Sequence, residues 1–274
     1  MKQFNLTILL TMLVSMVSTK ALAYDVSVAN EDGKTIYYNY INNSTELEVA
    51  KSNYSGDIKI PETVTILNKT RKVTSIGSEA FRYCSGLTSV TIPASVTSIG
   101  SYAFSNCSGL KKVIVKDLAA WCGISCRGNY SNPLYYAEHL YSDEDTEITD
   151  LIIPDGVTSI GSSAFSNCDN LADFVSLIQE PFKVSSIVSD FIYKNGTLYV
   201  PEGTMEKYKA TDGWKEFLWM EEGMPAGIKL TNSDGSNVME IQRYTIGGES
   251  IDHPQRGVNI VKMSDGTVKK VLVK

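Results

Sequence analysis

Histidine is almost absent from this chain, which has only His139 and His253 among its 274 residues. Acid–base and nucleophilic catalysis usually depend on histidine or on paired carboxylates held at a fixed distance. The chain also lacks G-x-S-x-G, H-E-x-x-H, a glycine loop for phosphate and EF-hand spacing. We expect His139 to be a partly packed side chain in an insertion. The sequence therefore predicts no enzyme activity, no catalytic residue and no cofactor.

Clusters of positive charge and long apolar stretches are equally scarce. Lys and Arg number 25 against 31 Asp and Glu, giving a formal net charge of −6 with no basic cluster. Nucleic acid and anionic membranes are therefore poor partners. Beyond the N-terminus no stretch approaches the roughly 18 uninterrupted apolar residues of a membrane-spanning helix. We expect no transmembrane segment after signal cleavage.

The N-terminus is the one strongly apolar part of the chain. Lys2 precedes an apolar run over residues 4–17, and Ala21-Leu-Ala23 supplies small residues before Tyr24. This order is typical of a secretory signal peptide with its cleavage site. We predict a signal peptide over 1–23, cleaved near Ala23, and a secreted or outer-cell-surface location.

One phrase occurs three times, over residues 73–87, 96–110 and 157–171. Each copy reads Val-Thr-Ser-Ile-Gly-Ser-x-Ala-Phe-x-x-Cys-x-x-Leu. A period in the twenties indicates stacked supersecondary units, because one such unit cannot bury enough apolar surface to fold alone. Within a unit we expect a short helix beginning near Glu79, capped by Ser78, and a left-handed residue at Gly86 where that helix ends.

Related strand endings extend the repeat beyond these copies, at 58–61, 113–116, 151–154 and 198–201. They predict about five or six coils. The expected fold is a β-rich α/β repeat, a solenoid with an N-terminal β cap and a small C-terminal β module.

The domain boundaries follow from where the repeat starts, breaks and ends. We expect an N-terminal cap over 24–72, then a solenoid over 73–223 that carries an insertion over 118–150 and a C-terminal cap. A linker then leads to a small β module over 227–274, whose alternating strands flank Asp265-Gly266 in a strong hairpin pattern. The C-terminal cap should hold a helix over 205–219, with three aromatic side chains covering the last coil: Trp214, Phe217 and Trp219.

The five cysteines do not predict a disulfide framework. Cys84, Cys107 and Cys168 share one slot of the repeat, and equivalent residues of stacked coils have parallel Cα–Cβ directions, which a disulfide cannot use. We expect them to be small buried hydrophobic residues. Cys122 and Cys126 could form a local disulfide, and the sequence leaves this open. A zinc site is disfavoured because only His139 lies near them as a further ligand.

The expected function is binding, because the chain combines a rigid repeat, export and no catalytic constellation. The expected partner is an extracellular protein, and a glycan held by tyrosines, among them Tyr130, is the alternative. A structural surface protein without a ligand also stays open. The acidic run 143–147 should be a solvated loop, with weak calcium binding left open. Residues on the outward strand face and in the insertion are the candidate binding residues: Lys59, Thr88, Ser89, Thr91, Lys111, Lys112, Ile114, Ile152, Tyr199, Tyr135 and Tyr136.

The repeated phrase and its Val-Thr-Ile-Pro strands resemble the BspA-like leucine-rich repeats of exported proteins from Bacteroidetes and some protozoa. The resemblance covers roughly residues 24–222. It implies a cell-surface or secreted adhesin-like protein, since some members bind host matrix proteins, and it brings no catalytic motif. The tail, 244–274, is similar to the C-terminal sorting domains of Bacteroidetes proteins exported across the outer membrane. That similarity implies sorting or surface attachment by the C-terminal module.

Overall fold

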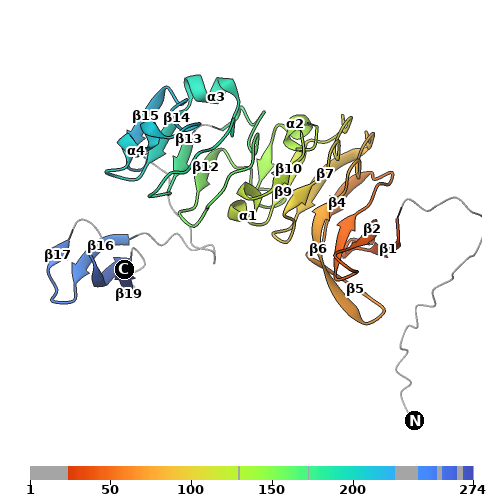
Figure 1. The fold of residues 1–274 in the computed structure, drawn as a ribbon, viewed down its shortest axis with the longest axis horizontal. Coiled ribbons are helices and arrows are strands. Elements are labelled where there is room, and N and C mark those ends of the chain that lie inside the picture. Colours follow the sequence, from red (N-terminus) through yellow and green to blue (C-terminus); the bar gives the residue numbers. More distant parts are fainter. Residues whose placement is uncertain are drawn as a thin grey trace, which may run out of the picture. The chain divides into compact units, whose positions relative to one another are not determined.

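The structure is a computed structural model that describes residues 24–128, 130–171, 173–225, 240–251, 255–263 and 268–273. The signal peptide predicted over 1–23 lies outside these residues. The chain divides into two compact units, Met1–Asp145 and Thr146–Lys274, and each is described by itself. Both are built mainly from short strands (Figure 1). No helix in the described ranges has the length and apolar character needed to cross a membrane.

The first unit opens with antiparallel strands that end in parallel pairing. β1 pairs with β2, β2 with β3, and β5 with β6, all antiparallel. β3 then pairs in parallel with β6, and the sheet continues in parallel through β8 to β10. This sheet contains β1 (Val26–Ala29), β2 (Thr35–Ile41), β3 (Glu46–Val49), β5 (Thr63–Ile66), β6 (Lys69–Ile76), β8 (Ser98–Ile99) and β10 (Ser125–Cys126).

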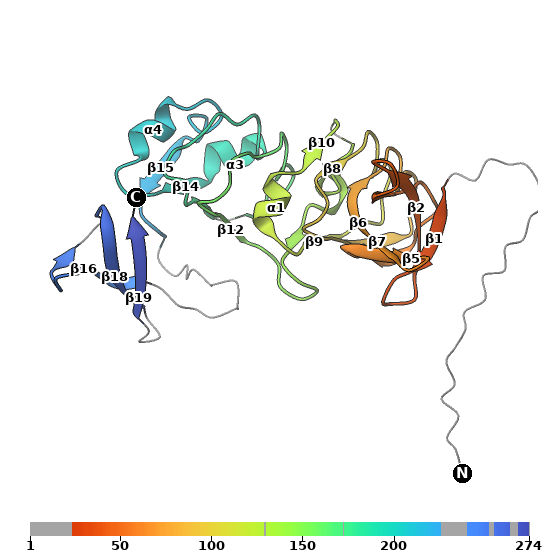
Figure 2. The ribbon, with the colours of Figure 1, turned by 60° about the horizontal axis from the view of Figure 1, so that its bottom comes forward.

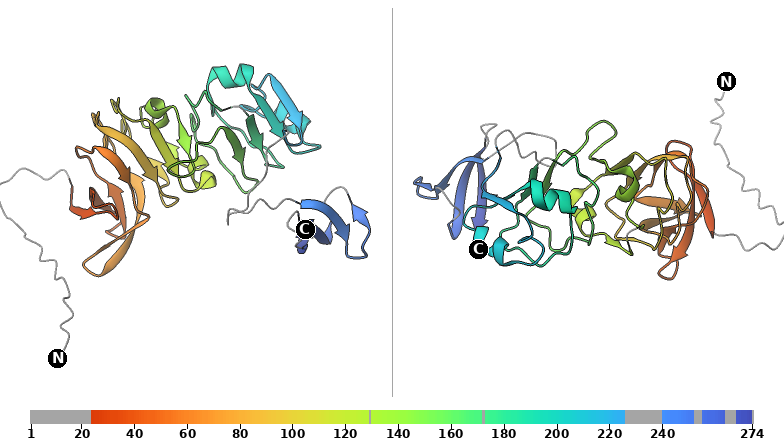
Figure 3. Two further views of the ribbon diagram at one scale, coloured as in Figure 1. Left: turned by 180° about the vertical axis from the view of Figure 1, so that it is seen from behind. Right: turned by 90° about the horizontal axis from the view of Figure 1, so that it is seen from above.

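A second sheet of the first unit is parallel throughout, in the order β11-β9-β7-β4. The register places Lys59 opposite Thr91, Thr91 opposite Ile114, and Ile114 opposite Tyr141. β4, β7 and β9 lie side by side in Figure 1 and can be followed from behind in Figure 3. The sheet is formed by β4 (Gly56–Lys59), β7 (Leu87–Ile92), β9 (Lys112–Val115) and β11 (Leu140–Tyr141).

Equivalent apolar residues of successive coils stack in the core between these sheets. The rings of Phe81 and Phe104 have centroids 4.8 Å apart and planes 6° apart, and Tyr54 continues the column at 4.6 Å from Phe81. Cys84 and Cys107 are also buried, and all five cysteines of the chain are free thiols, including the pair for which a local disulfide was left open. Burial raises the pKa of the Cys107 thiol to about 12, so it is protonated at neutral pH. These thiols are buried as expected, and they also make hydrogen bonds between coils: Cys107 Sγ donates to the Phe81 carbonyl oxygen at 3.0 Å.

The turn layer differs from the expected short helices. Residues 78–83 and 101–106 form successive turns, and Glu79 and Tyr83 have positive φ, as do Tyr102 and Asn106. A helix could not include these left-handed residues. Their backbone groups bond to the next coil instead: Phe81 N–H donates to the Ala103 carbonyl oxygen at 2.8 Å. The prediction of a capped helix near Glu79 is therefore wrong, because bonds between coils replace bonds within a helix.

Glycine recurs at fixed positions of the repeat, and at Gly100 and Gly109 the reason is close packing between coils. Gly86 and Gly109 do not have the left-handed backbone expected of a helix end. A Cβ on Gly109 would lie 2.2 Å from the Ser85 carbonyl oxygen, and one on Gly100 would lie 2.4 Å from the Ser78 nitrogen. Glycine therefore stands at these positions because the backbone of the preceding coil is too close for a side chain.

The insertion adds two short helices to the first unit. α1 (Leu118–Cys122) is capped by the Asp117 side chain, which accepts from the Ala120 N–H. α2 (Leu134–Ala137) begins after Pro133 and ends at Glu138, which has left-handed φ. Leu140–Tyr141 then returns as β11, so the insertion ends by adding a strand to the parallel sheet.

The second unit contains another parallel sheet, in the order β12-β13-β14-β15. Ile152 lies opposite Val175, and Val175 opposite Tyr199. Phe165 is fully buried and meets Phe174 edge-on at 6.2 Å. The elements of this part are labelled in Figure 1 and, except for β13, in Figure 2: β12 (Asp150–Ile153), β13 (Asp173–Ser176), α3 (Asp190–Asn195), β14 (Thr197–Val200), α4 (Met205–Ala210) and β15 (Trp219–Glu222).

The helix expected over 205–219 is shorter than predicted. α4 ends at Ala210, Thr211 is extended, and Gly213 has a φ of +88° with a virtual Cβ 2.2 Å from the Val184 carbonyl oxygen. The chain then turns back and adds β15 in parallel to β14. Trp214 is buried as predicted, whereas Trp219 is 62% exposed on this edge strand. The prediction that Trp219 covers the last coil is wrong, because a strand replaces the second half of the helix.

The C-terminal strands form an antiparallel sheet in the order β17-β16-β18-β19. The expected hairpin partners, β18 and β19, pair over six residues each. Gly248 takes the left-handed backbone of the turn between β16 and β17, with a φ of +85°. The turn around Asp265-Gly266 lies outside the described residues. The strands are β16 (Glu240–Thr245), β17 (Ser250–Ile251), β18 (Gly257–Met263) and β19 (Val268–Val273).

Candidate binding site

A groove of about 660 Å³ lies over the parallel sheet of the first unit. Strand residues form its floor. The turn before β2, at residues 30–34, forms one wall, and the acidic loop after β11, at residues 142–147, forms another. The lining residues are Asp32, Lys34, Gly56, Asp57, Lys59, Thr88, Ser89, Thr91, Lys111, Lys112, Ile114, Glu144 and Asp145.

Strand alternation and register position the floor. Asp57 and Lys59 are two residues apart on β4, so their side chains leave the sheet on the same face. Asp57 lies opposite Ser89, which lies opposite Lys112 on β9. The floor therefore consists of rungs that run across three coils: Asp57, Ser89 and Lys112 form one, and Lys59, Thr91 and Ile114 form the next.

Two hydroxyl groups hold the carboxylate of Asp57. Thr88 Oγ1 and Ser89 Oγ both donate to Asp57 Oδ1 at 2.7 Å. These hydrogen bonds, from Thr88 first, lower the pKa of Asp57 below its ordinary value. Asp57 is therefore a fixed negative charge on the floor at neutral pH.

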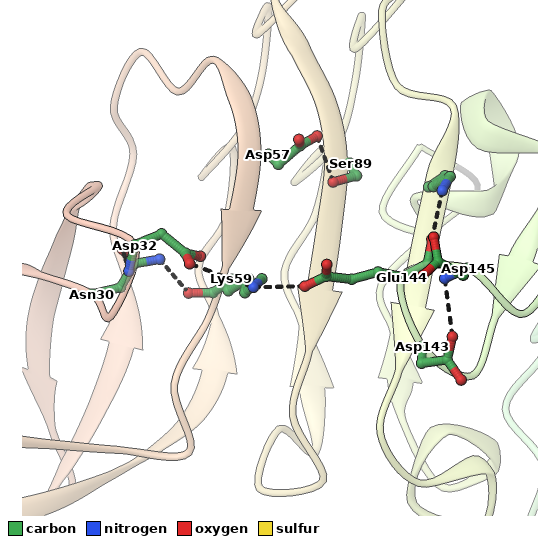
Figure 4. A network of polar contacts seen from close by, with 9 residues as sticks. Asn30, Asp32, Asp57, Lys59, Ser89, Asp143, Glu144 and Asp145 are labelled. Carbon is green, nitrogen blue, oxygen red and sulfur yellow. Dashed lines mark hydrogen bonds and ion pairs between the residues drawn. The ribbon is translucent and has the colours of Figure 1, made fainter.

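Lys59 links the two walls of the groove, as Figure 4 shows. Its Nζ lies 2.6 Å from Glu144 Oε1 on one side and 3.4 Å from Asp32 Oδ1 on the other. Asn30 Nδ2 donates to the Lys59 carbonyl oxygen at 3.0 Å, which ties the turn before β2 to β4. Contact with Lys59 lowers the pKa of Glu144, and contact with Glu144 raises the pKa of Lys59. The acidic loop is thus exposed, as predicted, but it is also attached to the sheet.

Lys112 holds the same loop at a second point. Its Nζ donates to the Glu144 carbonyl oxygen at 2.6 Å and lies 4.6 Å from the centre of the Tyr141 ring. Within the loop, Asp145 N–H donates to Asp143 Oδ1 at 2.9 Å. Glu144 is therefore bound through its side chain by β4 and through its backbone by β9.

The groove brings together seven of the candidate residues named from the sequence. Three of them are nearly covered: Ser89, Thr91 and Ile114 are 8%, 6% and 3% exposed. Ile152 and Tyr199 lie in the second unit, so no common surface with the groove is assigned to them. The seven that line the groove are Lys59, Thr88, Ser89, Thr91, Lys111, Lys112 and Ile114.

Several lining residues were not identified from the sequence. Asp57 could have been found, because it precedes Lys59 by two residues in a strand whose outward face was already assigned. Nothing in the local sequence places Asp32 or Glu144 beside Lys59. Those contacts join segments 27 or more residues apart and depend on the folded path of the turn and the loop.

Tyr135 and Tyr136 belong to a different feature of the first unit, a tyrosine ladder. We define the ladder as Tyr102, Tyr130, Tyr135 and Tyr136. The Tyr102 and Tyr130 rings are 6.2 Å apart with planes 12° apart, and Tyr130 meets Tyr135 edge-on at 5.2 Å. Tyr135 meets Tyr136 edge-on at 5.1 Å. The first three of these rings are 51%, 44% and 41% exposed, so the ladder presents aromatic surface to solvent, and the Arg82 guanidinium lies 5.6 Å from the centre of the Tyr102 ring.

The described residues offer no cluster of three or more His, Cys, Asp or Glu side chains placed to hold a metal ion. The acidic run over 143–147 is among the described residues, and its carboxylates do not form such a cluster. His139 is partly buried, and His253 lies outside the described residues.

Comparison with known proteins identifies the repeat. Residues 57–126 and 139–197 match the family described as BspA type Leucine rich repeat region, in six copies. No curated protein matches the chain.

Three solved structures are similar to the chain. A leucine-rich repeat protein from Bacteroides ovatus is 21% identical, with a TM-score of 0.34 over 71% of this chain and 53% of that one, so the chain spans about half its length. A leucine rich cell surface protein from Faecalibacterium prausnitzii is 18% identical, with a TM-score of 0.32 over 89% and 60%. A leucine rich repeat protein of T. pallidum is 18% identical, with a TM-score of 0.29 over 60% and 83%.

Proposed function

We propose that the chain is an exported, non-enzymatic binding protein. The match of residues 57–126 and 139–197 to BspA-type leucine-rich repeats supports this proposal. Its partner is an extracellular protein, as for an adhesin, and it binds in the groove over β4, β7 and β9. Residues 1–23 serve as the signal peptide, 73–223 form a solenoid behind the cap 24–72, and 227–274 act in sorting or attachment. The groove is the observation that carries this proposal.

The chemistry of the groove suits a protein surface. It combines hydroxyl groups, the aliphatic Ile114, and charges of both signs within one concave face. Protein–protein interfaces typically have a less polar centre and a polar, charged rim. Complementary charges at that rim set the specificity and the association rate of binding. The rigid parallel sheet below keeps these groups in place without further ordering on binding.

Charge reversal on the groove tests this function. Lys111→Glu together with Lys112→Glu should weaken capture of an extracellular protein by about tenfold or more, because both lysines border the groove. The protein is immobilised, extracellular matrix proteins are applied, and each captured protein is identified and its binding measured by surface plasmon resonance.

Lys72→Glu on β6 is the matched control, since Lys72 is exposed and does not line the groove. Equal binding by the two charge-reversed proteins, or no captured partner at all, would remove the case for this function.

A second candidate function is glycan binding, favoured by the tyrosine ladder. Exposed aromatic faces pack against the C–H groups of sugar rings, and phenolic hydroxyl groups supply hydrogen bonds at the edge. Tyr102, Tyr130 and Tyr135 offer three such rings in mutual contact. Tyr199, which the sequence also suggested, lies in the second unit and is not part of the ladder.

A glycan array separates this second function from protein binding. If the ladder binds sugar, saturable binding should fall at least about tenfold on Tyr135→Ala and on Tyr102→Ala, since each removes a ring face of roughly 1–2 kcal/mol. Phe191→Ala is the control, because Phe191 is 56% exposed but lies in the second unit. An equal loss in the Phe191 variant, or an empty array, would argue against the ladder.

A further inference from the structure

The acidic loop after β11 occupies the groove in the manner of a bound peptide. We define this loop as residues 142–147. The Glu144 carboxylate forms an ion pair with Lys59, with Oε1 and Nζ 2.6 Å apart. The Glu144 backbone carbonyl oxygen accepts a hydrogen bond from Lys112 Nζ at 2.6 Å. A bound peptide would be held by the same two kinds of contact, one to a side chain and one to the main chain.

The groove gains a net positive charge when the loop is set aside. The strands and the turn before β2 contribute four lysines, Lys34, Lys59, Lys111 and Lys112, against two aspartates, Asp32 and Asp57. This surface carries a net positive charge in a chain whose formal net charge is −6. Glu144 and Asp145 from the loop bring the groove to neutrality. The surface beneath the loop is thus complementary to acidic groups.

The loop also divides the available space. A second hollow of about 470 Å³ adjoins the groove, and Lys59, Thr91 and Glu144 border both. Removing the Glu144 side chain from Lys59 would therefore join the two hollows and uncover Thr91, which is now 6% exposed. The longer channel would accept an extended segment.

Attachment of the loop is reversible on energetic grounds. The Lys59 and Glu144 side chains are 31% and 62% exposed, and ion pairs with such exposure contribute little to stability. β11 tethers the loop beside its site, which gives the loop a high effective concentration there. A free acidic segment with more contacts can replace it.

We propose that the loop 142–147 is a built-in ligand of the groove, and that the partner presents an acidic peptide segment which displaces the loop. This inference rests on the proposed function, because it specifies the partner of the same groove. It also makes the loop a negative regulator, since its carboxylates reduce the affinity for every acidic competitor.

The test uses the mature full-length protein and a fluorescent peptide with the sequence of residues 140–149. A second peptide has Asn and Gln in place of its Asp and Glu residues. Binding is followed by fluorescence anisotropy at low salt. Glu144→Gln should bind the acidic peptide about two- to fivefold more tightly than the unaltered protein, because it weakens the internal competitor. Lys112→Ala should bind it several-fold more weakly.

Glu138→Gln is the matched control, since Glu138 is an exposed acid of the same insertion that does not line the groove. Unchanged melting temperatures show that the variants fold. The inference is overturned if Glu144→Gln and Glu138→Gln bind alike, if the neutral peptide binds equally well, or if a sulfated glycan displaces the acidic peptide far more effectively than unlabelled peptide does.

The two proposals can fail separately. If a captured extracellular protein depends on Lys111 and Lys112 but ignores both Glu144→Gln and excess acidic peptide, the groove binds proteins and the built-in ligand is rejected. If the acidic peptide binds as expected but no extracellular protein is captured, the groove accepts acidic segments and the adhesin-like function is rejected.

Discussion

Phe104→Ala should lower the free energy of unfolding by about 3–5 kcal/mol. Phe104 is fully buried and stacks on Phe81 at 4.8 Å, at one end of the aromatic column of Tyr54, Phe81 and Phe104. Neighbouring coils are fixed by hydrogen bonds between their turns, so they cannot collapse into the cavity. Denaturant unfolding followed by circular dichroism measures the loss.

Tyr102→Ala provides the comparison, because Tyr102 stands two residues away in the same turn and is 51% exposed. Both positions lose an aromatic ring, but only Phe104 leaves a cavity. The Tyr102 variant should lose less than about 1 kcal/mol. Similar losses in the two variants would show that the column does not carry the stability of the first unit.

Gly109→Ala should cost about 3 kcal/mol or more, although it adds a single methyl group. The new Cβ would lie 2.2 Å from the Ser85 carbonyl oxygen and 3.1 Å from the Leu87 carbonyl oxygen. Both are backbone atoms of the preceding coil, so the clash is relieved only by separating two coils. Thermal unfolding of the purified variant measures the effect.

Gly156→Ala is the matched control, because its Cβ would have no atom within 4 Å and its backbone is not left-handed. This variant should be neutral or more stable by about 0.4–1 kcal/mol, through reduced freedom of the unfolded chain. If Gly109→Ala were as harmless, the coils would not be in the close contact described.

The buried residues and the strand pairing could be predicted because they repeat. Val90, Val113 and Leu151 each follow the same alternation, and every one is buried. Repetition averages out local ambiguity, since a misread position in one copy is corrected by the next. The same alternation assigned an outward face to the parallel strands, although Ser89, Thr91 and Ile114 on that face are only 8%, 6% and 3% exposed.

The turns could not be predicted because their hydrogen bonds run between coils. The segment at Glu79 has the composition of a short capped helix, but its amide groups find carbonyl partners in the neighbouring turn. The sequence of one coil does not show these hydrogen bonds to the next coil, and such tertiary contacts override local helix propensity. The position of Trp219 was mispredicted for a similar reason: its segment pairs with β14 as the edge strand β15 and does not continue the helix.

The groove was predicted only in part for the same physical reason. Its floor follows strand alternation, whereas its walls arise where Asp32 and Glu144 approach Lys59 from distant segments. Charge alone could not assign that pairing, because the chain has 31 acidic residues from which a partner could come.

None of the five cysteines, all of which the structure describes, forms a disulfide, so the fold does not depend on an oxidised cysteine pair. All five cysteines are reduced, and the shared slot of the repeat is packed rather than cross-linked. Small disulfide-rich domains need oxidation to stay folded, whereas here the packing between repeats supplies the cohesion. The scaffold that displays the groove should therefore keep its shape in oxygen-free surroundings, where thiols stay reduced and disulfide-dependent proteins lose their cross-links.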